Sequence, residues 1–138
     1  MSFFLKEQEV VVASPLSGIL TKNLQPLRNT KLIRRLDWGD GEVVDEVCTN
    51  DEGFFEFSGR REKLKLSPLA EFVVSQKIVA LDDEEETLLW LKSKRDADLY
   101  SELGGIPKNF RCELTNEFQR MELTRGTFAT SCRWDGIE

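Results

Sequence analysis

The chain has 138 residues, 40% of them hydrophobic and 32% charged, which is the composition of one folded domain and excludes a disordered segment. Its net charge of −6 argues against nucleic acid as the main ligand, because phosphate binding needs a cationic face. No apolar run is long enough for a membrane helix, and the first residues lack the basic start of an export signal. We therefore expect a cytoplasmic protein.

The first half of the chain reads as short strands separated by turn residues. We expect strands at residues 10–12, 18–21, 30–36, 42–49 and 54–57. Asp40-Gly41 predicts a type I′ hairpin, because both central positions of that turn need positive φ. Strand 42–49 has apolar residues on both faces, which predicts that it is covered on both sides.

The acidic stretch Asn50-Asp51-Glu52-Gly53 raises a choice between a calcium loop and a turn. A calcium loop of the EF-hand type with Gly53 at its sixth position would place Cys48 first and Gly59 twelfth. Neither residue offers the required carboxylate. A turn is favoured instead, since Asn and Asp tolerate turn geometry and Gly permits positive φ. Phe55 and Phe57 then point to one face of the next strand and anchor the core.

A family resemblance rests on residues 17–57, under a third of the chain. Gly18 starts a strand, Pro26-Leu27 ends a turn, and Thr49, Gly53 and the two phenylalanines of "GFFEF" follow. This pattern resembles the transthyretin-like, carboxypeptidase-regulatory-like β-sandwich domains. Leu24 departs from it, because the family often has a polar residue or glycine there. The resemblance implies a fold and says almost nothing of function.

In the second half, residues 58–67 are basic and polar and read as a loop. Residues 71–81 and 87–94 read as two strands of a long hairpin around an acidic run. One short helix is expected near 96–103, with Asp96 as N-cap and a stop at Gly104-Gly105, before two final strands at 110–114 and 128–134. Seven or eight strands in a single domain, 1–138, predict a mainly β, antiparallel two-sheet sandwich of transthyretin-like or Ig-like type.

The residues that carry most catalysis are missing from the sequence. There is no histidine, so Ser-His-Asp and Cys-His catalysis are excluded in their usual form, and no phosphate-binding glycine motif occurs. Cys48, Cys112 and Cys132 are widely spaced, and we expect reduced, buried thiols rather than nucleophiles or zinc ligands. Carboxylates are plentiful, so a paired-acid glycosidase stays formally open. We predict that the chain is not an enzyme and holds no metal or cofactor.

Charge and exposed aromatic residues point instead to contacts with a partner. Asp82, Asp83, Glu84, Glu85 and Glu86 are expected at a solvated hairpin tip, where they either discourage edge pairing or steer a basic partner. Trp38 and Asp40 lie at a second predicted tip.

Two roles are open for Trp38: binding a partner, or packing against the end of the sandwich. Trp90 and Trp134 are expected in the core, and Arg34-Arg35 and the basic residues of 60–65 on solvated faces that also suit an acidic partner.

Two hypotheses follow. The first is a non-catalytic protein-binding domain, an adaptor or a bacterial cytosolic protein that neutralises its partner as immunity proteins neutralise toxins. Its partner would have a basic surface and would be neither nucleic acid nor membrane. The alternative is a carbohydrate-binding or cell-surface accessory module that uses Trp38.

Overall fold

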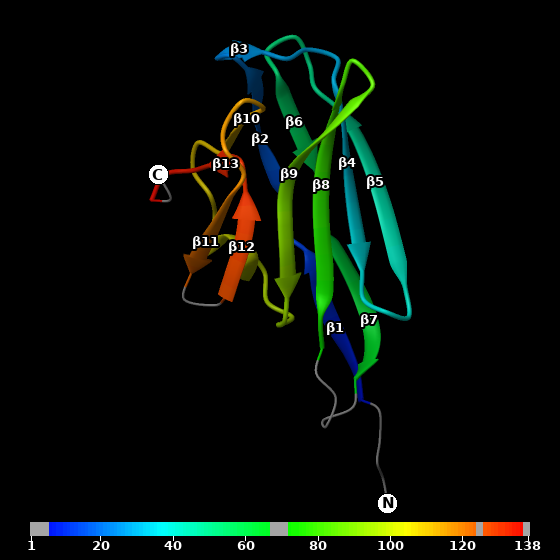
Figure 1. Cartoon of the computed structure of the whole chain (residues 1–138). Coiled ribbons are helices and arrows are strands. Elements are labelled where there is room, and N and C mark those ends of the chain that lie inside the picture. The colour runs from blue at the N-terminus through cyan, green and yellow to red at the C-terminus, as the bar shows by residue number, and fades with distance from the viewer. Residues whose placement is uncertain (1–5, 67–71, 124–125, 137–138) are drawn as a thin grey trace, which may run out of the picture.

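The computed structural model describes residues 6–66, 72–123 and 126–136. Almost all regular structure in these ranges is β, in antiparallel sheets that pack together as a sandwich (Figure 1), which confirms the predicted fold class. The strands are β1 Lys6–Ala13, β2 Leu16–Lys22, β3 Gln25–Pro26, β4 Lys31–Asp37, β5 Glu42–Cys48, β6 Phe54–Phe57, β7 Arg60–Leu66, β8 Val74–Asp82, β9 Glu85–Lys94, β10 Arg111–Glu113, β11 Gln119–Leu123, β12 Gly126–Thr130 and β13 Cys132–Arg133. The predicted long hairpin is β8–β9.

One layer is a six-stranded sheet in the order β11-β12-β9-β8-β4-β5, with every neighbouring pair antiparallel. Its inner positions on β4 and β8 are buried, and the outer ones are mostly exposed. On β5 the outer residues Val44 and Cys48 are exposed, so the prediction that this strand is covered on both sides was wrong. An edge strand in an outer layer has one face with no covering segment.

The second layer is a bent ribbon. β1 pairs with β7 and β2 pairs with β6, and both strands of the ribbon break at one place, Ser14-Pro15 on one side and Ser58-Gly59 on the other. β10 joins β2 in parallel and carries β13 at its other edge. The expected loop at 58–67 is therefore wrong over the described residues, because β7 alternates exposed and half-buried side chains as a paired strand does.

The core lies between the two layers in two clusters. The larger contains Phe55, Phe57, Trp90 and Trp134, with Trp134 stacked on Phe110 at 5.4 Å between ring centroids. The inward direction of the two phenylalanines and the burial of both tryptophans confirm the predictions. The smaller cluster lies under the β1–β7 end of the ribbon and is formed by Val10, Val12, Ala13, Leu36 and Val74.

Arg34 is the main exception to the predicted core. It is 3% exposed rather than solvated, since its position on β4 faces inward. Its guanidinium donates to Asp45 Oδ2 and to the Ser58 carbonyl, both at 2.7 Å, and lies 4.8 Å from the centre of the Phe57 ring. A planar cation with five donors can serve a carboxylate, a carbonyl and an aromatic face together. Arg34 thereby fastens the six-stranded sheet to the bend of the ribbon.

One of the two predicted turns is confirmed and the other is wrong. Asn50 Oδ1 accepts the backbone N–H of Glu52 and of Phe54, and Gly53 has φ 77°, so the predicted turn is confirmed. The β4–β5 hairpin turns at Gly39-Asp40, with positive φ at Gly39 and not at Asp40 or Gly41. The predicted type I′ turn at Asp40-Gly41 is wrong, because the strands pair up to Asp37 and Glu42 and leave a four-residue connection.

The connection after β9 is irregular, and the helix expected at 96–103 is wrong. Only Ser101–Leu103 forms a single 3₁₀ turn, which ends at Gly104 with φ 74°. Asp96 caps no helix. Its Oδ1 accepts the backbone N–H of Asp98 and the hydroxyl of Ser101, and these bonds fold the segment locally.

Of the predictions for the cysteines, the burial of Cys112 and Cys132 is confirmed, whereas their reduced state and the burial of Cys48 were wrong. Cys112 and Cys132 are directly opposite in the β10–β13 pair and form a buried disulfide. Cys48 is free and exposed on the edge strand β5. The predicted reduced state rested on the expected cytoplasmic location and on wide sequence spacing, and spacing says nothing about which residues a sheet brings opposite each other.

Candidate interaction surface

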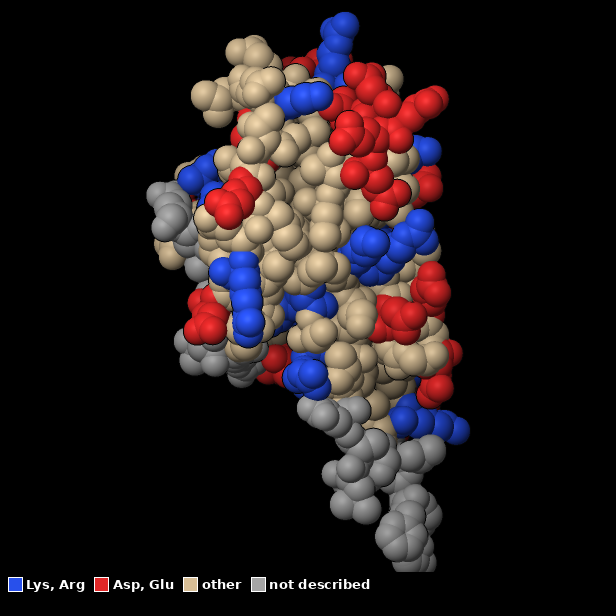
Figure 2. All heavy atoms as spheres, viewed as in Figure 1, with Lys and Arg blue, Asp and Glu red and all other residues tan. Residues whose placement is uncertain are grey.

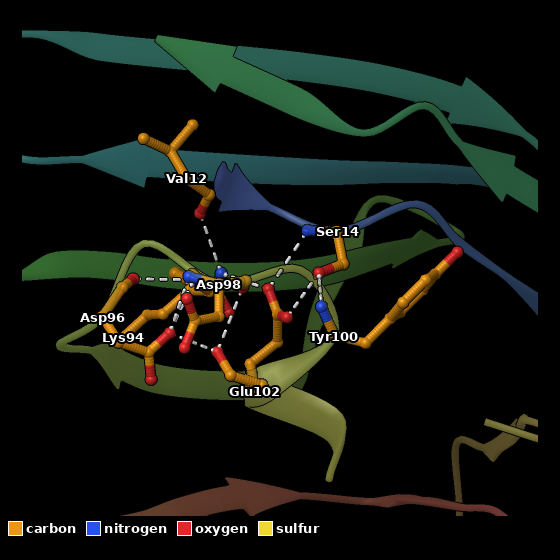
Figure 3. Close-up of polar contacts among 9 residues, drawn as sticks. Val12, Ser14, Lys94, Asp96, Asp98, Tyr100 and Glu102 are labelled. Carbon is orange, nitrogen blue, oxygen red and sulfur yellow. Dashed lines mark hydrogen bonds and ion pairs between the residues drawn. The ribbon is translucent and has the colours of Figure 1, made fainter. Parts of the chain in front are cut away.

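Buried polar groups gather where the ribbon bends (Figure 3). Glu102 is 4% exposed, and its carboxylate accepts the backbone N–H and the hydroxyl of Ser14 and the amide of Gln76. Gln76 also donates to the Val12 carbonyl at 2.9 Å and accepts from Trp90 Nε1 at 3.1 Å. This cluster ties the connection after β9 to the bend in the ribbon.

Lys94 is equally buried, and its ammonium donates to the carbonyl and the carboxylate of Asp96 at 2.7 and 3.2 Å. The cavity beside Glu102 measures about 20 Å³, which holds one water molecule and no substrate. Both ionisable groups therefore have their partners inside the protein. Their arrangement stabilises the fold and offers no exposed reactive atom.

The predicted acidic residues lie at the β8–β9 end of the six-stranded sheet. Asp82 and Glu85 are paired across the hairpin, and Asp83 and Glu84 form its two-residue turn with φ 49° and 67°, the type I′ pattern. Asp83, Glu84, Glu85 and Glu86 are exposed, and we call these four residues the acidic tip.

Asp82 is next to the acidic tip but differs from its four residues in having an ion-pair partner. It forms an ion pair with Lys22 at 2.7 Å, and its side chain is 16% exposed. The hydrogen bond to Asp82 raises the pKa of Lys22, and the charges of Asp83 and Glu85 raise it further. The negative charges of the tip thus act electrostatically on Lys22, whereas Asp82 binds Lys22 directly and attaches the hairpin to β2.

Trp38 and Asp40 lie at the opposite end of the same sheet. The ladder between β4 and β8 runs from the Lys31–Leu81 pair to the Asp37–Ser75 pair, roughly 20 Å at the usual rise per residue. Trp38 is half-buried against the smaller core cluster, with its indole over Gly41, and Asp40 is exposed. The structure therefore does not bring the two groups of predicted partner-binding residues together.

A cationic row crosses the outer face of the six-stranded sheet between these ends. Five cross-strand pairs align one residue from each strand in the order Val44, Arg35, Lys77, Leu91, Ala129 and Arg120. Arg35 and Lys77 are directly opposite, an unfavourable like-charge pair, and neither has an ion-pair partner among the described residues. Figure 2 shows Lys and Arg side chains across the middle of this face and a dense group of Asp and Glu near the β8–β9 tip.

Sequence reasoning missed this row. The sequence predicts Arg35 on a solvated face together with Arg34 and gives Lys77 no role within its strand, and Arg120 belongs to a strand that it does not predict. Alternation along β4 and β8 carries a signal, since it places Arg35 and Lys77 on outward positions of their strands. The register that sets them opposite each other is not visible in the sequence.

Comparison with known proteins gives one match. A family model described as "Domain of unknown function (DUF6795)" matches residues 16–117. No curated protein and no solved structure matches the chain. Within the described residues, the structure contains no helix of the length and apolar character that a membrane crossing requires.

Proposed function

We propose that this chain, which belongs to the DUF6795 family, is a non-catalytic protein-binding domain that uses its acidic tip to bind a partner with a basic surface. One observation carries the proposal: four exposed carboxylates lie together at the end of a long paired hairpin, two on its turn and two at the start of β9. A rigid group of like charges speeds the encounter with a surface of opposite charge.

The remaining ionisable groups support a role without catalysis. Glu102 and Lys94 are buried and have hydrogen-bond partners within the protein, and Glu113 is held by five hydrogen bonds. Catalytic acids and bases need access to a substrate and a pKa near the working pH. The finer assignments, a bacterial partner-neutralising or adaptor protein and a transthyretin-like relationship, belong to this proposal and rest on size, charge and the motif at 17–57.

Association kinetics test the proposal. A partner is first recovered with the intact protein from its native source and confirmed as stoichiometric by calorimetry. Its association rate is then measured by stopped flow at two ionic strengths with two variants that each remove four negative charges. The tip variant is Asp83→Asn, Glu84→Gln, Glu85→Gln and Glu86→Gln, and the control variant is Glu7→Gln, Glu42→Gln, Glu56→Gln and Glu117→Gln, all at exposed positions.

We expect the tip variant to associate about tenfold more slowly than the control variant at low salt, because only the tip steers the partner. The wild-type rate should fall as salt is added. Equal, salt-independent rates would leave the acidic run as a solubility feature. Failure to recover any stoichiometric protein partner would contradict the proposal as a whole.

The compartment is part of the proposal. We expect a cytoplasmic location, whereas a disulfide between Cys112 and Cys132 is typical of oxidising compartments. Alkylation of thiols in intact native cells, followed by mass spectrometry, separates the two. Free thiols at both positions support the cytoplasm, and a protected pair contradicts it.

The carbohydrate-binding alternative depends on Trp38. Its indole is half-buried and packs over Gly41, where an added Cβ would lie 2.5 Å from the ring, so less of the aromatic face is open for stacking on a sugar. A glycan array with wild type and Trp38→Ala tests it. Sugar binding that is lost in the variant would favour the alternative over the protein-binding proposal.

A further inference from the structure

The outer face of the six-stranded sheet carries a row of apolar residues beside its cationic row. Ile33 lies two residues before Arg35 on β4, so both residues face outward. The register aligns Ile33 with Val79 on β8 and, through Val79, with Leu88 on β9. A sheet face that meets only water usually carries polar residues, so an apolar row is unusual in this place.

Exposed apolar side chains continue this row toward the cationic residues. Val44 and Leu91 are 44% and 39% exposed, whereas Ile33 and Val79 are buried and form the floor between them. Figure 2 shows uncharged surface over β8 and β9, next to the dense group of Asp and Glu. A contiguous apolar patch on the surface of a domain often marks a contact with another macromolecule. We call Ile33, Val44, Val79, Leu88 and Leu91 the outer apolar patch.

Opposite charges lie on the two sides of this patch along the strands. On β8, Lys77 lies two residues before Val79. Leu81, the cross-strand partner of Glu86, lies two residues after Val79. The cationic row and Glu86 of the acidic tip are therefore about equally far from Val79 along the strands, at roughly 7 Å for two residues. A surface with opposite charges at equal distances from an apolar centre is complementary to a copy of itself.

We propose that two copies of the chain bind face to face through the outer apolar patch, with the cationic row of each copy facing the acidic tip of the other. A two-fold axis that lies in the plane of the face and crosses the strands near Val79 exchanges the two charged ends. An axis parallel to the strands would place one cationic row on the other, which like charge disfavours. The proposed contact also relieves the repulsion between Arg35 and Lys77 within each copy.

Sedimentation velocity of the intact protein tests the dimer. Cys48 is exposed on β5 and can cross-link two copies, so wild type is measured beside Cys48→Ser. We expect both proteins to form the same reversible dimer between about 1 and 500 µM, a range that covers the affinity of a weak interface. Raising the salt from about 50 to 500 mM should weaken the dimer about tenfold, because the charges at both ends are screened.

Matched substitutions locate the contact. Leu91→Ser and Lys77→Glu should each weaken the dimer about tenfold. The controls Leu99→Ser and Lys108→Glu, at exposed positions outside the six-stranded sheet, should leave it unchanged. Adding Glu86→Lys to Lys77→Glu should restore the dimer, since the exchanged charges face each other again across the two-fold axis. All these side chains are exposed, so the variants should keep the urea unfolding midpoint of wild type.

Several results would overturn the inference. A monomer at every concentration up to about 500 µM would do so, as would a dimer that disappears in Cys48→Ser or growth beyond the dimer. Equal effects of the patch variants and their controls would contradict the contact, and a double variant that dimerises no better than Lys77→Glu would contradict the two-fold arrangement. A different protein whose binding Leu91→Ser abolishes, with no dimer in its absence, would assign the patch to that protein.

The dimer goes beyond the proposed function, because its partner is a second copy of the chain, and the two can fail separately. In the dimer the acidic tip faces the second copy, so a basic partner that binds the tip should convert dimer to monomer. Lys77→Glu keeps all four residues of the tip and should lose the dimer while it still captures that partner. Absence of a dimer would defeat this inference alone, and absence of a stoichiometric partner would defeat the proposed function alone.

Discussion

Glu113→Gln is the most informative single substitution, because one buried carboxylate holds together two segments far apart in the chain. Glu113 is 8% exposed and accepts five hydrogen bonds, from the Thr21 hydroxyl, the backbone N–H groups of Asn23 and Leu24, and both donors of Thr115. Asn23 and Leu24 have φ 53° and 67°. The carboxylate therefore fixes the strained turn between β2 and β3 to the end of β10.

The loss in the free energy of unfolding can be calculated in two ways, from the pKa of Glu113 and from the hydrogen bonds that the substitution removes. Burial raises the pKa of Glu113, but the hydrogen bonds from Thr115, Leu24 and Thr21 outweigh it and lower the pKa from 4.5 to about 2. That difference corresponds to about 3 kcal/mol of stability near neutral pH. In the variant, the amide nitrogen replaces one acceptor and leaves at least one backbone N–H without a partner, at about 1–3 kcal/mol each. We expect Glu113→Gln to lower the free energy of unfolding by about 3 kcal/mol.

The contribution of Glu113 to the free energy of unfolding should decrease as the pH falls. The pKa of Glu113 is lower in the folded state than in the unfolded state, so its contribution is complete above about pH 4.5 and is lost as the pH falls toward 2. The difference between wild type and Glu113→Gln should shrink to about 1 kcal/mol at pH 3. Urea unfolding followed by tryptophan fluorescence at pH 7 and pH 3 measures it. The exposed control Glu56→Gln should change stability by less than about 0.5 kcal/mol.

A Glu113→Gln variant as stable as Glu56→Gln at pH 7 would refute the reasoning. So would a difference of the same size at both pH values.

Three further predictions concern stability and use the same urea unfolding assay. Asp45→Asn should cost about 3 kcal/mol, because it leaves the buried guanidinium of Arg34 without its carboxylate; a cost below about 1 kcal/mol would contradict that role. Replacing Cys112 and Cys132 together by serine should lower stability by about 3 kcal/mol, the value for a loop of roughly twenty residues, and an unchanged midpoint would argue against the disulfide. Leu24→Gly should raise stability by up to about 1 kcal/mol, since Leu24 has positive φ and is 81% exposed; a lower midpoint would show that its side chain contributes.

The sequence by itself determined the features that depend on near neighbours. Alternating side chains predicted strands at 54–57 and 87–94 because a strand places successive residues on opposite faces, and the inward direction of Phe55 and Phe57 followed. Five adjacent carboxylates could not enter a core, so their place at a hairpin end was predictable as well. These inferences use interactions within a few residues along the chain.

Only the tertiary structure decided which distant residues meet. The burial of Arg34, the disulfide between Cys112 and Cys132, and the parallel pairing that brings Glu113 to the β2–β3 turn each join segments 11 to 92 residues apart. The same holds for Arg35 opposite Lys77 and for the buried Lys92 beside Thr127. A strand pattern states which face a residue occupies but not the partner strand or the register, because many pairings bury the same apolar face equally well.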